Sequence, residues 1–257
     1  MNLTDDATLK FQKGSPIFLE DICAIYPATM GEIVDEGYEN FQKYLGLLTS
    51  TRPPISGDGP EQQALSELSD FQYLILIATL DPEIGQLLRR AFMFFTHEEI
   101  VFTLEPTQII IGPIEEKHIL TEEHFSDLQM ILRRMFFIEQ EGDEIIINPD
   151  DNPATVRLKK KMIENREKVR RAKAKKAARE KNDLKLSDLI GSLTINNCGL
   201  NMEKIWNITY YAFHDQLKRM GWRDQFNINN QAALAGAKLK KNQLKHWMRS
   251  IANSEQS

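Results

Sequence analysis

Histidine, cysteine and acidic side chains are the groups in this sequence that could hold a metal ion or take part in acid–base or nucleophilic chemistry. Of five histidines, only His118 and His124 lie near each other, with two glutamates between them. These residue types can ligate a metal, but a polar helix start explains the cluster better. The run 97–99 has no second histidine four residues on, as a helical zinc-protease motif requires. We therefore expect no metal site.

The cysteines and carboxylates show no catalytic pattern either. Cys23 and Cys198 lie far apart among apolar residues, and Cys23 has no base beside it, so buried thiols in a reducing compartment are expected. No glycine-rich phosphate-binding motif is present. The carboxylates of residues 1–156 lack the spacing of paired acid–base residues. The sequence predicts a protein that is not an enzyme and needs no cofactor.

A run of basic residues is the strongest local feature. Residues 157–181 contain 13 Lys and Arg against 3 Asp and Glu. Three interpretations are open: a solvated linker helix with ion pairs one turn apart, docking onto an acidic protein surface, and non-specific contact with nucleic acid phosphates. The run has no base-reading or aromatic residues, so nucleic acid is the least favoured partner.

Charge is divided unevenly along the rest of the chain. Residues 1–156 carry 9 Lys and Arg against 28 Asp and Glu, and residues 182–257 carry 10 against 6. Such asymmetry indicates parts with different partners, or parts that attract one another. It predicts three segments: an acidic α+β domain over 1–150, a long basic helix or linker over 151–182, and a small helical domain over 183–257.

Composition places the chain among folded proteins outside the membrane. Hydrophobic residues make up 42% and charged residues 27% of the 257 residues, values typical of a globular protein. No stretch approaches the roughly 18 consecutive apolar residues of a membrane span. The first residues lack the basic and apolar regions of a secretory signal. We expect no membrane association.

Local signals predict small hairpins and several helices in the first 150 residues. Residues 9–26 have the pattern of a β-hairpin, in which residues 9–11 form the first strand. Thr29 and Glu32 fit a capping box at a helix start, and Asp81-Pro82 predicts another start. The further expected elements are helices over 61–80, 83–95 and 121–136, a hairpin of 100–104 with 109–111, and a short strand at 145–147.

The C-terminal part is predicted to be all α-helical. Asn152-Pro153 begins the basic helix, since Asn caps and Pro occupies the first turn. Asn201 would cap a helix that ends at Gly221, followed by a turn at Gly236 and a last helix near residues 244–251. An α+β N-terminal domain, a long basic linker helix and an all-α C-terminal domain make up the predicted fold.

Aromatic residues concentrate in the predicted C-terminal domain. At helical spacing, Trp206, Tyr210 and Phe213 share one face, while Tyr211 falls to the side. Such a cluster is ordinarily core packing, which is the favoured interpretation. A groove for a partner helix could use the same residues.

Two stretches carry a resemblance to a known family. The first is 25–33, Ile-Tyr-Pro-Ala-Thr-Met-Gly-Glu-Ile, with Gly37-Tyr38 and Tyr44-Leu45 after it; the second is 186–251, including the aromatic cluster and His246-Trp247. Together they resemble tail assembly chaperones of phages that infect Gram-positive bacteria. The resemblance covers roughly the first 50 and the last 70 residues.

The resemblance implies a protein that acts by binding. A chaperone of this family would cover the tape measure protein and keep it soluble in the cytoplasm of the bacterial host, and the segregated charge adds possible self-association. A permanent tail or baseplate component and a non-specific nucleic-acid-binding protein are the alternatives. The residues expected to contact a partner are Arg157, Lys160, Arg170, Arg171, Lys175, Trp206, Tyr210, Tyr211, Phe213 and Trp247.

Overall fold

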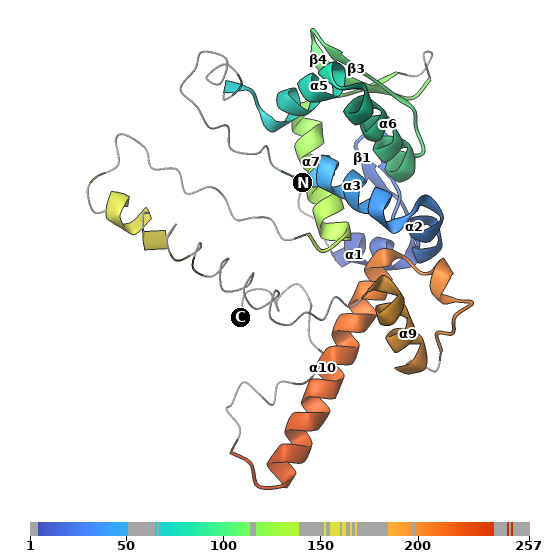
Figure 1. Cartoon of the computed structure of the whole chain (residues 1–257), viewed down its shortest axis with the longest axis vertical. Helices are drawn as coiled ribbons and strands as arrows, with labels where there is room; N and C mark the ends of the chain where they lie inside the picture. The colour runs from blue at the N-terminus through green and yellow to red at the C-terminus, as the bar shows by residue number, and fades with distance from the viewer. Residues whose placement is uncertain are drawn as a thin grey trace. The chain divides into compact units, whose positions relative to one another are not determined.

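The described part of the chain is mostly helical, with two small antiparallel sheets and a helical C-terminal region (Figure 1). The computed structural model describes residues 5–50, 65, 67–113, 117–138, 152, 155–159, 161, 162, 165, 168, 185–196, 199–238, 246 and 248. The chain divides into two compact units, of which one comprises Met1–Ile138 with Leu193–Ser257 and the other Glu139–Ser192. The boundaries predicted at residues 150 and 182 stay a prediction, because the residues around both lie outside the described part.

Helices and strands alternate irregularly along the chain. Their order is α1 (Asp5–Lys13), β1 (Ile17–Leu19), β2 (Cys23–Ile25), α2 (Met30–Glu36), α3 (Tyr38–Thr49), α5 (Asp70–Leu80), α6 (Pro82–Thr96), β3 (Ile100–Leu104), β4 (Thr107–Ile111), β5 (His118–Leu120), α7 (Glu122–Met135), α9 (Leu186–Asn196), the 3₁₀ turn η1 (Ile205–Asn207) and α10 (Tyr210–Leu234).

The first helix corrects the predicted first hairpin. Residues 9–11 are not a strand but belong to α1, in which Ala7 and Phe11 are buried. These two residues are four apart and share one helix face. Aspartates in the first turn and lysines in the last also suit the helix dipole. A hairpin is present, but β1 and β2 form it, with Phe18 opposite Ala24.

Two predicted helix starts are confirmed. The Thr29 hydroxyl accepts from the Glu32 N–H at 3.2 Å, and the Glu32 carboxylate accepts from the Thr29 N–H at 2.7 Å. The Asp81 carboxylate accepts a hydrogen bond from the Glu83 N–H at 2.8 Å, and proline occupies the first turn of α6. Gly37, with φ of +90°, separates α2 from α3, because glycine adopts this backbone conformation without a steric penalty.

The second sheet confirms one predicted hairpin and adds a strand. β3 and β4 pair as expected, and β5 pairs with β4 on the other side. A three-residue strand is too short to show a period of two, so no sequence pattern indicates it. Of the helix expected over 61–80, residues 70–80 form α5, which begins after a Ser69 cap. Leu68 and Ser69 are not helical, so the predicted helix is interrupted there, and residues 61–64 and 66 lie outside the described residues. The strand predicted at 145–147 lies outside the described residues.

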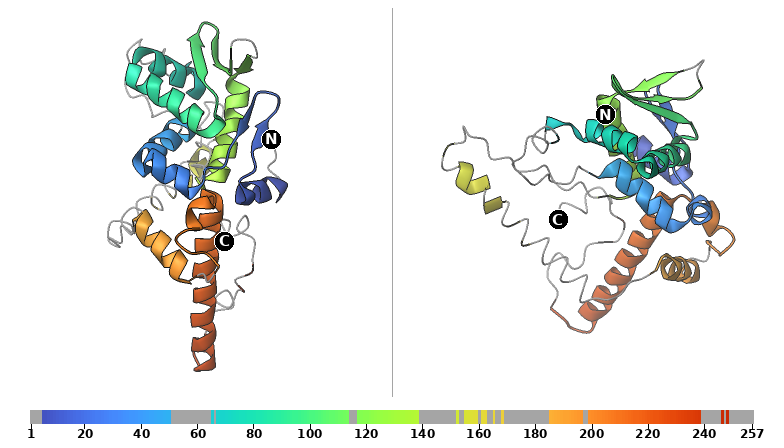
Figure 2. Two further views of the ribbon diagram at one scale, coloured as in Figure 1. Left: turned by 90° about the vertical axis from the view of Figure 1, so that its right-hand side faces the viewer. Right: turned by 45° about the horizontal axis from the view of Figure 1, so that its top comes forward.

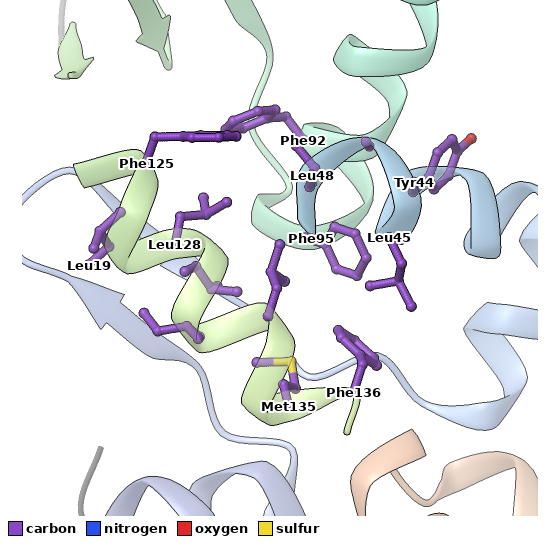
Figure 3. Packing of buried hydrophobic residues seen from close by; sticks show 14 of the residues in the cluster. Leu19, Tyr44, Leu45, Leu48, Phe92, Phe95, Phe125, Leu128, Met135 and Phe136 are labelled. Atoms are coloured by element: carbon purple, nitrogen blue, oxygen red, sulfur yellow. The ribbon is translucent and has the colours of Figure 1, made fainter. Parts of the chain in front are cut away.

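Helices α3, α6 and α7 enclose the main core together with the first hairpin. Figure 3 shows Leu48 of α3, Phe95 of α6 and Leu128 of α7 directed toward the same interior. Polar side chains of α7 complete the end of α3: Gln129 donates to the Leu48 carbonyl at 2.9 Å, and the Arg133 guanidinium donates to the Thr49 carbonyl at 2.6 Å. Carbonyls that lack partners at a helix end are thereby satisfied.

The helix predicted to run from Asn201 to Gly221 has other bounds in the structure. Of the last helix predicted near residues 244–251, only residues 246 and 248 lie in the described part, and neither is helical. The Asn201 side chain accepts a hydrogen bond from the Lys204 N–H at 2.9 Å, but only the short turn η1 follows it. The long helix α10 begins after Thr209 and continues through Gly221 to Leu234 (Figure 2). Gly221 was expected to end a helix and does not, because an exposed helical glycine costs only about 1 kcal/mol relative to alanine. The turn at Gly236, with φ of +91°, is confirmed.

Only the beginning of the basic helix falls in the described part. The Asn152 side chain accepts from the Thr155 N–H at 2.8 Å, as a helix cap does. Residues 155–159, 161, 162, 165 and 168 are helical. The long basic helix as a whole stays a prediction.

Candidate interaction surface

Backbone pairing joins the start of α10 to the N-terminal part of the chain. Thr209 forms an antiparallel bridge with Thr29. The Tyr210 N–H donates to the Ala28 carbonyl at 2.9 Å, and the Thr209 hydroxyl donates to the Phe11 carbonyl at 2.7 Å. The same hydroxyl accepts from the backbone N–H three residues on, as the cap of α10. One threonine therefore both begins the helix and fixes it to α1.

Aromatic packing continues this junction along the first turns of α10. The Tyr211 ring lies 5.5 Å from that of Phe11 and 4.6 Å from that of Phe137, between ring centroids. Phe213 is fully buried. Burial raises the pKa of both Tyr210 and Tyr211, so both phenols stay neutral. We call residues 210–219 the root of α10, since each of them is buried or half-buried.

The ten residues predicted to contact a partner are placed as follows. Tyr211 and Phe213 are buried, and Trp206 and Tyr210 are half-buried. This burial agrees with the core-packing interpretation of the aromatic cluster. Arg157 is exposed. A partner-binding role for any of the ten stays a prediction. The predicted residues that the structure does not describe are Lys160, Arg170, Arg171, Lys175 and Trp247.

Besides the two tyrosines, the root contains a histidine and an aspartate that can titrate. Burial, together with the smaller effect of the nearby Lys218 ammonium, lowers the pKa of His214 to about 4. A neutral imidazole at physiological pH follows. The buried Asp215 carboxylate accepts from the Arg219 guanidinium at 2.9 Å, so the charge in this interior has a partner.

The second half of α10, residues 221–234, is here called its tip, and it is exposed and nearly uncharged. Residues 225–237 include no charged side chain, although 27% of the chain is charged, and five of the seven residues 225–231 are Asn or Gln. Ile228 is 61% and Leu234 is 82% exposed. No described helix, α10 included, has the length and apolar character needed to cross a membrane. The tip thus offers apolar and amide groups on a supported helix.

The expectations drawn from the sequence did not include a role for the tip or for Thr209. Thr209 has the residue type of a helix cap, and the break in charge after Asp224 is visible without a structure. Both signals were available. Their importance depends on long-range packing, which distinguishes the root from the tip and has no local signature.

His124 and Cys23 are two further side chains whose chemistry the sequence raised. The His124 ring lies 3.1 Å from the Thr121 hydroxyl and 3.5 Å from the Glu20 carboxylate, at the polar helix start that the sequence favoured. Burial raises the pKa of the Cys23 thiol to about 12, and Glu98 adds to this shift. Within the residues that the structure describes, no group of three or more His, Cys, Asp or Glu is placed to hold a metal ion.

Comparison with known proteins adds one finding. A family model described as the YomV second domain matches residues 174–252. YomV comes from a Bacillus phage region, and the match indicates a phage protein. The matched range contains α9, η1 and α10, so both the root and the tip lie within it. No curated protein and no solved structure matches the chain.

Proposed function

We propose that this phage protein is a tail assembly chaperone, which binds the tape measure protein and keeps it soluble while the tail is built in the host cytoplasm. The observation that carries the proposal is the tip of α10. It presents Ile228 and Leu234 to solvent on a helix whose root is held in a core. The resemblance to tail assembly chaperones supports the same class of function.

The chemistry of the tip suits a helical, amphipathic partner. Exposed apolar side chains can cover apolar stripes of such a partner and so reduce its aggregation. Amide side chains both donate and accept hydrogen bonds, so the neighbouring Asn and Gln residues can pair with varied polar groups. Because the tip lacks charge over 225–237, we expect its binding to depend little on salt.

Co-expression tests this proposal. With the wild-type chain, the tape measure protein of the same phage should stay soluble and co-purify. The double variant Ile228→Gln and Leu234→Gln removes both apolar side chains without adding charge, and we expect most of the soluble tape measure protein to be lost. Asn227→Gln introduces the same residue type at a neighbouring exposed position and should keep full capture.

Two further outcomes decide the class of protein. An insoluble tape measure protein that fails to co-purify with the wild-type chain would contradict the chaperone proposal. Mass spectrometry of purified virions separates a chaperone from a permanent tail component, because a chaperone leaves before the particle is complete. A stoichiometric presence in virions would favour the structural alternative.

A further inference from the structure

The sheet β3–β4–β5 has one face covered by helices and one apolar row on the opposite face. Helices α5 and α6 contact its strands, and Ile109 and Leu120 are buried on the covered face. The strand register places Val101, Ile110 and Ile119 directly beside one another across the three strands. Val101 is 59% and Ile119 is 47% exposed. These three residues are called the outer row.

The outer row lies in a strongly acidic part of the chain. Residues 97–123 contain seven Glu and one Lys. Pairing the outer rows of two copies face to face would bring like charges together, which is unfavourable. The occupant that suits this face is therefore a basic segment with a small apolar surface of its own.

The chain itself contains a segment of that kind. Residues 155–168 include six Lys and Arg against two Glu. Leu158 and Met162 are helical and four apart, so they share one face. They are 61% and 44% exposed. This segment thus presents an apolar pair among positive charges, complementary to an apolar row among negative ones.

We propose that residues 155–168 of one copy dock onto the outer row of a second copy. Leu158 and Met162 would cover the outer row, while the surrounding Lys and Arg meet the glutamates of residues 97–123. The two surfaces in contact are different, so each copy keeps one surface free, and the contact extends into a chain of copies unless it closes into a ring. This goes beyond the proposed function and uses other residues.

The contact is small, so its strength depends on charge as well as on apolar area. It engages three residues on one side and two on the other, well below the roughly 800 Å² per partner of a standard interface. We expect weak association, at about micromolar concentrations or above, which many copies in a row would strengthen. Raising salt from about 0.05 M to about 0.5 M should weaken it, because exposed charges are screened.

Sedimentation velocity of the full-length chain tests the contact. The wild type should form larger species as concentration rises. Ile119→Lys places a positive charge on the outer row, opposite the basic segment, and Leu158→Glu places a negative charge on the basic segment, opposite the acidic surface. Each substitution sets like charges against each other and should weaken association by about tenfold or more. Val34→Lys makes the same charge change at an exposed apolar residue of α2 and should associate as the wild type does. Circular dichroism checks that each variant is folded.

A mixing experiment identifies the arrangement. The Ile119→Lys copy keeps its basic segment, and the Leu158→Glu copy keeps its outer row, so their mixture should form pairs that neither forms alone. A wild type that stays monomeric at all concentrations would overturn the proposal, as would Ile119→Lys copies that associate normally. Cross-linking within one chain between Ile119→Cys and Leu158→Cys would show an intramolecular contact and also overturn it. None of these outcomes depends on the tape measure protein.

Discussion

The root and the tip of α10 belong to one continuous helix but meet opposite surroundings. The root directly follows Thr209, which is bridged to Thr29, and it contains the fully buried Phe213 and a neutral histidine. The tip exposes Ile228 and Leu234 in a stretch, residues 225–237, that has no charged side chain. One helix therefore has a packed half and an exposed half. Substitutions at the root should change folding, whereas those at the tip should change binding.

The largest expected effect is at Phe213. Phe213→Ala removes a fully buried ring and leaves a cavity, which should lower the free energy of unfolding by about 3–5 kcal/mol. Leu234→Ala at the tip should change it by no more than about 0.5 kcal/mol, since that side chain is mostly in solvent. Urea unfolding followed by circular dichroism measures both. Similar losses for the two variants would break the distinction between root and tip.

The second effect is a pH dependence that arises at the root. The pKa of His214 is about 4 in the folded chain and about 6.5 when the chain is unfolded. Between these values the unfolded chain binds a proton that the folded chain does not, so stability falls as pH falls. From pH 7 to pH 5 we expect a loss of about 2 kcal/mol from this residue.

His214→Gln isolates this contribution from that of the carboxylates. Its loss of stability between pH 7 and pH 5 should be smaller than that of the wild type by the same amount. Lys218 and Tyr210, which lie near the His214 ring in the wild type, are unchanged in the variant. Parallel curves for the two proteins would show that His214 is not held neutral.

A smaller loss is expected at the bridge. Thr209→Ala removes the cap of α10 and the hydrogen bond to the Phe11 carbonyl, and should cost about 1–2 kcal/mol. Thr209→Ser keeps the hydroxyl and is the matched control, so it should retain most of the stability. If serine costs as much as alanine, packing of the methyl group rather than hydrogen bonding fixes the root.

The sequence predicted the features that local signals determine. The capping box at Thr29, the start at Asp81 and the hairpin of β3 with β4 follow from residues only a few positions apart. Residues 9–11 were misassigned because a short apolar run fits a strand and a helix equally well. Gly221 was misjudged because glycine is a common but not an obligatory helix end.

The candidate surface was less predictable for a physical reason. Aromatic residues of the root were considered for partner binding as well as for packing, since type and spacing are the same for both. Their burial depends on the pairing of Thr209 with Thr29, which are far apart in sequence and have no local signal for each other. The tip was not predicted because the exposure of Ile228 and Leu234 depends on how the rest of the chain packs, which no local pattern indicates.

The smallest expected effect is a gain at Gly221, where the tip begins. A Cβ added to this exposed helical glycine would meet no atom within 4 Å, so Gly221→Ala should stabilise the chain by about 0.5–1 kcal/mol through helix propensity alone. At Gly85 the same substitution would place the Cβ 2.5 Å from the Ala78 carbonyl oxygen, where α6 packs on α5, and should destabilise. Thermal unfolding measures both changes in stability, the gain expected at Gly221 and the loss expected at Gly85. Since Gly221 has no side chain to lose, capture of the tape measure protein by Gly221→Ala should remain complete, and reduced capture would mean that binding needs a flexible junction between root and tip.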